Sequence, residues 1–267
     1  MYSILLQDNW LDVHLLFTLA IFAFLYGFLI KHYTTTALFS KQCFLFIVSL
    51  ILFYFSIESP ISHVSMSTHM VQMSILYFMV PPILLLGIPS QIFRFLHRHS
   101  WTKTMKPFII SPNHALISFA ILFFLYHIPS VLTWLLQHSF LLKGYSIILL
   151  LLAFPMWWPI VAPMDILCAK NKLKMKRYAT LSGIYLMPAC LFFILSGVID
   201  LNSHPFLMDP SLCLTNPSGA IGFFLSPIGM RIDQVIAGLL MMGIHKIGMI
   251  IAFRLRTTEH SVNQKIF

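Results

Sequence analysis

Seven long apolar runs dominate this 267-residue chain and constrain its fold more than any other feature. Lipid offers no hydrogen-bond partner to an open backbone, so apolar runs of about 17–25 residues are expected to cross a membrane as α-helices. The composition agrees, because 58% of the residues are hydrophobic and 9% are charged, whereas a soluble domain carries roughly 25% charged residues. We predict an all-α membrane protein with spans at residues 13–30, 42–58, 68–88, 108–128, 144–162, 178–199 and 232–253.

Lysine and arginine alternate between the predicted connections. Of these 17 residues, fourteen lie in the first, third and fifth connections and the C-terminal tail, two lie in the other connections, and Lys246 lies inside a span. The positive-inside rule places basic connections in the cytoplasm. We therefore predict seven transmembrane helices in a single domain over residues 1–267, with the N-terminus outside and the C-terminus cytoplasmic. The net charge of +9 is then a topology signal and does not indicate nucleic-acid binding.

Two outer connections differ from simple tethers. Residues 129–143 (PSVLTWLLQHSFLLK) are too few to span and place Trp134, His138 and Lys143 among leucines. That pattern predicts an amphipathic helix in the membrane interface. Residues 200–231 are rich in Pro, Gly, Ser and Asn and contain an apolar GAIGFFLSP stretch, which suggests a cap over the outer mouth.

Histidine and methionine gather at the outer end of the third span, in the stretch SHVSMSTHMVQM. Positions 63, 66, 70 and 73 follow a 3–4–3 spacing, so they share one face if the helix extends that far. Imidazole and thioether groups together favour Cu(I) among physiological metals. The alternative is ordinary packing by methionines and hydration of the histidines, since the chain has 15 methionines. The candidate metal ligands here are His63, Met66, His69, Met70 and Met73.

Two further histidines fall near the same face of the membrane. His127 lies where the fourth span emerges, and His138 lies on the predicted interfacial helix. Histidines from separate helices can converge on one metal, and we add both to the candidate ligands. A solvated or hydrogen-bonded interfacial role stays open for each.

The seventh span contains polar residues that a bilayer penalises. Asp233 and Gln234 lie at its outer end, and His245 and Lys246 lie near its middle. A His-Lys pair at that depth is costly unless it faces the bundle interior or a wet cavity. Alternatively, Lys246 extends along the helix to the cytoplasmic interface.

Four sequence blocks resemble a known family. They are HMVQMSILYFMVPPILLLGIP (69–89), YHIPSVL (126–132), QHSFLLKGYSIILLLLAFPMWWPIVAP (137–163) and DQVIAGLLMMGIHKIGMI (233–250). In this order they are similar to the caa3-type CtaG family of bacterial cytochrome c oxidase assembly factors. The Pro-Pro and Trp-Trp-Pro blocks are the most specific parts of the resemblance.

The resemblance implies a seven-span protein of the bacterial plasma membrane that is needed to make active haem–copper oxidase. Its implied role is delivery or insertion of copper into the catalytic subunit, which makes that subunit the expected partner. By matching position, the motif residues are His69, Met73, His127, His138 and Asp233. Many members have histidine where this chain has Met73, which replaces one imidazole donor by a thioether.

These observations leave three ranked functions and one remote one. The first is a non-enzymatic assembly factor that takes Cu(I) from the outer face. The second is a copper transporter that also uses Met241, Met242 and His245, and the third is a metal-free scaffold that stabilises an oxidase subunit. A membrane enzyme with haem on His127 and His245 ranks last, and the chain has no Walker, Ser-His-Asp or His-Glu-x-x-His motif.

Overall fold

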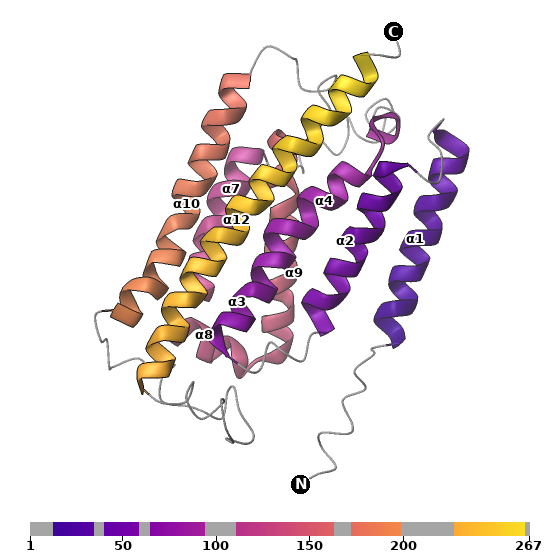
Figure 1. Cartoon of the computed structure of the whole chain (residues 1–267). Helices are drawn as coiled ribbons and strands as arrows, with labels where there is room; N and C mark the ends of the chain where they lie inside the picture. Colours follow the sequence, from indigo (N-terminus) through magenta and orange to yellow (C-terminus); the bar gives the residue numbers. More distant parts are fainter. Residues whose placement is uncertain are drawn as a thin grey trace.

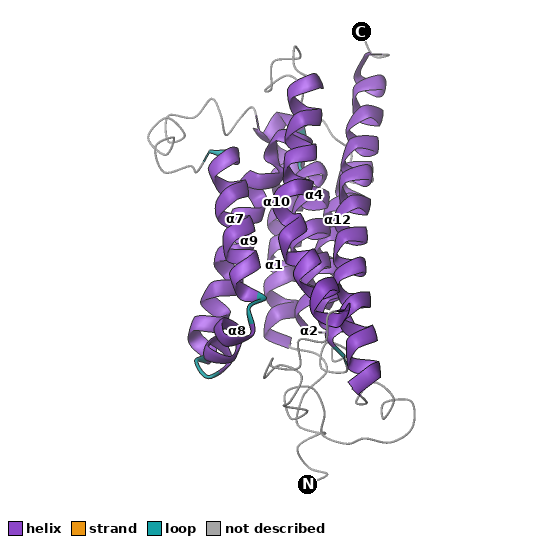
Figure 2. Cartoon of the chain, turned by 90° about the vertical axis from the view of Figure 1, so that its left-hand side faces the viewer, coloured by secondary structure: helices purple, strands orange, loops and turns teal. Residues whose placement is uncertain are grey.

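A computed structural model describes residues 13–34, 40–58, 65–93, 111–162, 172–198 and 227–264. Every regular element within these ranges is a helix, as Figures 1 and 2 show. Most of the predicted cap at residues 200–231 and the candidate ligand His63 lie outside the described residues.

Each predicted span coincides with a helix or a stack of helices. With the labels of Figure 1, the elements are α1 (Val13–Tyr33), α2 (Lys41–Glu58), α3 (Met66–Ser74), the π-helix η2 (Ile75–Met79), α4 (Val80–Gly87), α7 (Pro112–Tyr126), α8 (Pro129–Leu136), α9 (Ser139–Val161), α10 (Lys172–Val198) and α12 (Pro227–Gln264).

Among the described residues, five helical segments are long and apolar enough to cross a membrane, namely α1, α9, α10, α12 and the stack of α3, η2 and α4. The apolar parts of α2 and α7 are shorter. The predicted all-helical membrane fold is therefore confirmed. The number of seven spans stays a prediction, and so does the orientation of the termini.

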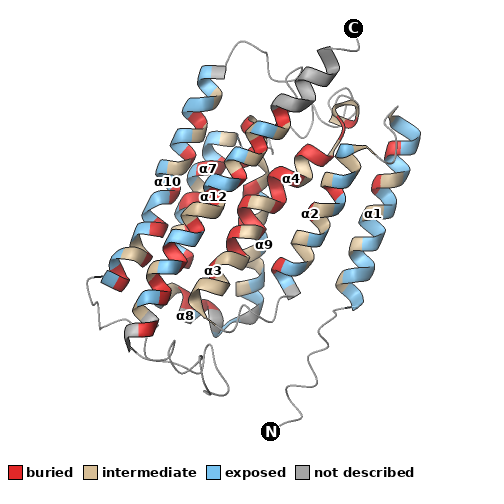
Figure 3. Cartoon of the chain, viewed as in Figure 1, coloured by how far each residue is buried: buried red, intermediate tan, exposed pale blue. Residues whose placement is uncertain are grey.

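The stack formed by α3, η2 and α4 is the centre of the bundle. In the most apolar 18-residue stretch of this stack, 67% is buried inside the protein, whereas the corresponding value for α1 at the edge is 11%. Helices α2, α9 and α12 contact it on different sides, and the burial colouring of Figure 3 shows the contrast between this stack and α1. Any group on this stack that points inward is therefore shielded from lipid.

Two consecutive prolines interrupt the hydrogen bonding of this central stack. Pro81 and Pro82 occupy the first turn of α4 and have no N–H to donate to the carbonyls one turn earlier, those of Tyr77 and Phe78. The indole nitrogen of Trp157 on α9 donates to the Tyr77 carbonyl at 3.1 Å. A side chain from another helix thus replaces the missing backbone donor, as a lipid environment requires.

The Phe78 carbonyl is approached by Gly248 of α12. A Cβ atom added to Gly248 would fall well inside van der Waals contact with that oxygen. Only glycine lets the backbone of α12 come so close to the central stack. The proline pair therefore sets how both α9 and α12 pack on the stack.

A π-helical turn precedes the prolines. In η2 the Val80 N–H bonds to the Ile75 carbonyl, five residues back, which widens the turn relative to an α-helix. Two consecutive aromatic residues, Tyr77 and Phe78, are fully buried there. Both rings meet Phe119 and Phe123 of α7 edge-on, with centroids 5.5–6.1 Å apart. The wide turn thus supplies the aromatic core of the bundle.

Glycines also allow α10 and α12 to pack tightly. A Cβ on Gly238 would lie 2.7 Å from the Cys190 carbonyl oxygen, and one on Gly197 would lie 2.8 Å from the Arg231 carbonyl oxygen. Higher numbers on one helix face lower numbers on the other, so the two helices are antiparallel. Their contact is the most extensive in the described part of the bundle.

The predicted interfacial helix over residues 129–143 forms as two pieces. Helix α8 ends at Leu136, and α9 begins at Ser139, so Lys143 belongs to the first turns of α9. The break falls at His138, whose backbone is not helical (φ −125°, ψ 79°). The amphipathic segment is therefore shorter than predicted, and Figure 2 shows it at the base of α9.

The contact at Gly248 makes a direct prediction about stability. Gly248→Ala forces α12 away from the Phe78 carbonyl and is expected to lower the free energy of unfolding by about 1–3 kcal/mol, the usual cost of overpacking. Gly243 on the same helix is a matched control, because a Cβ there meets nothing within 4 Å. Thermal unfolding of both variants in detergent measures the difference, and equal stabilities would contradict this packing.

Candidate functional site

The carboxylate of Asp233 joins α12 to the start of α3. It accepts hydrogen bonds from the backbone N–H of Met66 at 2.7 Å, from the backbone N–H of Ser67 and from the Ser67 hydroxyl. The first N–H groups of a helix have no partner within the helix, and the helix dipole favours a negative charge there. Asp233 therefore positions α3, and its carboxylate has a structural role here.

Local sequence also determines where α3 begins. Ser65 is its N-cap, and Ser65 and Thr68 form a reciprocal capping box. The described helix consequently carries three members of the predicted ladder face, at positions 66, 70 and 73. Met70 is fully buried, Met73 is 6% exposed and Met66 is half-buried against the same core.

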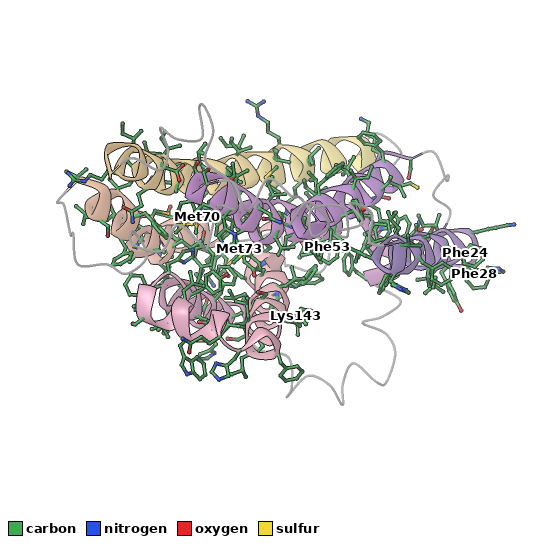
Figure 4. The ribbon with its side chains drawn as sticks, turned by 90° about the horizontal axis from the view of Figure 1, so that it is seen from below. Phe24, Phe28, Phe53, Met70, Met73 and Lys143 are labelled. Carbon is green, nitrogen blue, oxygen red and sulfur yellow. The ribbon has the colours of Figure 1, made fainter. Side chains whose placement is uncertain are left out.

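The sulfur-bearing side chains of Met70 and Met73 lie inside the bundle. Figure 4 shows both between helices, whereas Phe24 and Phe28 of α1 lie at the outer edge. The two methionines share one buried cluster with Phe123 and Tyr126 of α7 and Phe193 of α10. They therefore have the burial that a soft-metal site needs.

His127 reaches the same cluster from the end of α7. Its side chain is 3% exposed, and its ring lies among the rings of Phe123, Tyr126 and Phe193 at centroid distances of 4.5–5.4 Å. Its Nδ1 atom is hydrogen-bonded to the Phe123 carbonyl. A carbonyl only accepts, so Nδ1 carries the proton and Nε2 carries a lone pair.

The Nε2 atom of His127 is buried and has no hydrogen-bond partner within the part of the chain that the structure describes. A neutral imidazole whose Nδ1–H bonds to a carbonyl and whose Nε2 is free is the arrangement that metal-binding histidines adopt. A buried polar atom without a partner is costly and calls for an explanation. Coordination of a soft metal at Nε2 is one explanation, because Met70 and Met73 belong to the buried cluster that the His127 ring contacts through Phe123.

His69 approaches this histidine from α3. It is half-buried and directly precedes Met70 on α3. The structure thus places five predicted ligands at one end of the bundle, on two helices. Met66, His69, Met70 and Met73 lie on α3, and His127 lies at the end of α7.

The remaining predicted residues are placed differently. His138 is exposed, and its Nδ1 is hydrogen-bonded to the Trp134 carbonyl at 3.0 Å, so the structure does not bring it to the predicted ligands on α3. Gln234 is 7% exposed, and its buried Oε1 has no hydrogen-bond partner among the described residues. His245 is buried between Phe78 and Trp157, while the adjacent Lys246 is exposed.

The donor set decides which chemistry this end of the bundle suits. Within the described ranges no three His, Cys, Asp or Glu side chains group together as metal ligands. A site here must therefore use thioether sulfur beside imidazole nitrogen. That combination suits Cu(I), whereas hard cations prefer oxygen ligands.

Two partners of the site were not anticipated from the sequence. The Phe123 carbonyl determines the tautomer of His127, and Phe193 of α10 closes the ring pocket around it. The contact between the Phe123 carbonyl and His127 could have been predicted from the sequence, because these residues are one helical turn apart at a helix end. The second depends on the packing of α10 against α7 and leaves no pattern in the sequence.

A model of the cytochrome c oxidase caa3 assembly factor family matches residues 22–257. The chain belongs to this family. The resemblance noted from the four sequence blocks is therefore confirmed. No curated protein and no solved structure matches the chain, so the roles of its residues in an oxidase assembly factor rest on its own sequence and geometry.

The anchoring role of Asp233 is testable by two substitutions. Asp233→Leu leaves the N–H groups of Met66 and Ser67 without an acceptor, at an expected cost of about 1–3 kcal/mol in the free energy of unfolding. Asp233→Asn keeps one oxygen acceptor and is expected to lose less. Chemical or thermal unfolding in detergent compares them, and a leucine variant as stable as the asparagine variant would contradict the anchor.

Proposed function

We propose that this oxidase assembly factor receives Cu(I) at the buried end of α3 and passes it to the catalytic subunit of a haem–copper oxidase. The proposal takes the seven-span orientation predicted from the basic connections. It thereby places the start of α3 at the outer face of a bacterial plasma membrane. Copper is the cargo in this scheme, and the protein performs no covalent chemistry.

The observation that carries the proposal is the free Nε2 lone pair of His127. The atom is buried and has no hydrogen-bond partner among the described residues. The His127 ring contacts Phe123, which belongs to the same buried cluster as Met70 and Met73. Because Nδ1 already holds the proton, Cu(I) can bind at Nε2 without displacing one. Thioethers from Met70 and Met73 would complete a soft coordination sphere, with His69 as a further nitrogen donor nearer the surface.

The same donor set supports release. Thiolates hold Cu(I) tightly, and within the described residues the candidate set contains none. A site of imidazole and neutral thioethers binds a soft ion while leaving it exchangeable with ligands of a partner. Half-buried His69 would be the first group to meet copper and the last to release it.

The ligand assignment is tested by Cu(I) competition with a chromophoric chelator on the purified protein. His127→Phe preserves the aromatic packing and removes the nitrogen, and Met73→Leu preserves size and removes the sulfur. Each is expected to weaken Cu(I) binding about tenfold or more, which is about 1.4 kcal/mol of binding free energy. Oxidase copper content in membranes carrying each variant is expected to fall in parallel.

Met156→Leu is the control for loss of a buried methionine. Its backbone contacts Tyr178, which also bonds to Pro112 at the start of α7, so it lies at the opposite end of the bundle from His127. Unchanged Cu(I) affinity and oxidase copper in the His127 and Met73 variants would refute the site. Normal oxidase levels in both would instead favour the metal-free scaffold.

A further inference from the structure

A second concentration of soft donors lies deeper in the bundle, away from the end where α3 begins. A pocket of about 280 Å³ opens between α10 and α12, with Phe78 and Phe123 among the residues on its inner wall. Its sulfur and imidazole groups are Met187, Cys190, Met241, Met242, His245 and Met249. Neither the family description nor the proposed outer site accounts for this group.

His245 supplies the independent observation that points to a ligand. It is 7% exposed and lines the pocket, and its buried Nε2 has no hydrogen-bond partner in the described ranges of the chain. The cost of an unpaired imidazole nitrogen in the middle of a membrane span is removed when it coordinates a metal. The other ring contacts of His245, to Phe78 and Trp157, offer no hydrogen bond to that atom.

Helix geometry brings thioethers from α12 to this nitrogen. Met241, His245 and Met249 are spaced by four residues, so their side chains share one face of α12 and line the same pocket. Met241 is fully buried and Met249 is half-buried. The stripe therefore offers S, N and S donors in order along about 12 Å of helix.

The facing helix supplies a further sulfur. Gly238 lies against Cys190, and because the helices are antiparallel, Met187 lies level with the turn at 241 and 242. Side chains tilt toward the N-terminus of their own helix. The His245 side chain therefore tilts toward the start of α12, and that of Met187 tilts toward the start of α10. Because the helices are antiparallel, the two side chains approach each other from opposite walls of the pocket.

We propose a second Cu(I) site in the pocket between α10 and α12, with His245 as the nitrogen ligand and thioethers of Met241, Met249 and Met187 around it. Thioether and imidazole ligands select Cu(I) over Zn²⁺ and harder ions. Met187 is 46% exposed, so the pocket opens on the lateral face of the bundle. A partner subunit approaching in the plane of the membrane would meet copper there directly.

Lys246 provides a test of whether the bound ligand is a cation or an anion. It is exposed and lies at the pocket, and its positive charge opposes a bound cation and attracts a bound anion. Lys246→Met is therefore expected to retain or strengthen Cu(I) binding. Loss of binding in this variant would overturn the proposal in favour of an anionic ligand.

The decisive experiment counts Cu(I) equivalents on the full-length protein in detergent, by competition with a chromophoric chelator under reducing conditions. Wild-type protein is expected to bind two equivalents, His245→Phe one, and His127→Phe with Met73→Leu one. Met187→Leu, at a partly exposed position, is expected to weaken the second equivalent about tenfold with little effect on folding. Met156→Leu again serves as the control.

The experiment tests the two proposed sites independently of each other. If the outer variants bind as wild type while His245→Phe loses one equivalent, the pocket site stands and the outer site falls. If His245→Phe keeps both equivalents, the pocket site is refuted. X-ray absorption of the His127→Phe, Met73→Leu protein with one copper is expected to show both nitrogen and sulfur neighbours, and a spectrum without sulfur would also refute it.

Discussion

Every backbone carbonyl of a membrane helix needs a donor, and the structure depends on how this requirement is met at Pro81 and Pro82. The prolines leave the Tyr77 and Phe78 carbonyls without their usual partners, at the centre of the most buried helical stack. Trp157 donates to one, and Gly248 allows α12 to approach the other. Other side chains bond to carbonyls in the same way, with Tyr26 reaching Gly87 and Tyr178 reaching Met156. Arg256 similarly bonds to the last turn of α9 at Ile160.

The same stack carries the candidate ligands, so packing and chemistry are linked. Asp233 holds the first turn of α3 against α12, and the two methionines that follow then point into the bundle. The π-turn at η2 presents Tyr77 and Phe78 to Phe123, and Phe123 in turn contacts His127. A substitution at the proline pair would therefore be expected to change the packing both around His127 and around the lateral pocket.

Imidazole nitrogens without partners mark both proposed copper sites. His127 and His245 each bury an Nε2 atom that no described group satisfies, and each ring contacts aromatic rings. The ring of Phe123 contacts His127 and also lines the pocket of His245. The proposed site at the end of α3 would accept copper, and the proposed pocket site would suit transfer to a membrane-embedded partner because the pocket opens on the lateral face of the bundle. Together the two proposals combine the proposed delivery role with the deeper donors that a transport mechanism would require.

The sequence by itself determined the helical membrane fold, the positions of the helices and the family, because apolar run length and local motifs do not depend on tertiary contacts. It also predicted that Met70 and Met73 share one helix face, since helical spacing can be read from the sequence. The packing of the helices decided that His138 is exposed, that Asp233 caps α3, and that His245 is buried while the adjacent Lys246 is exposed. These outcomes depend on which helices are neighbours and on the rotation of each about its axis. Close contacts such as those at Gly238 and Gly248 set both, and no pattern within a single helix encodes its partner.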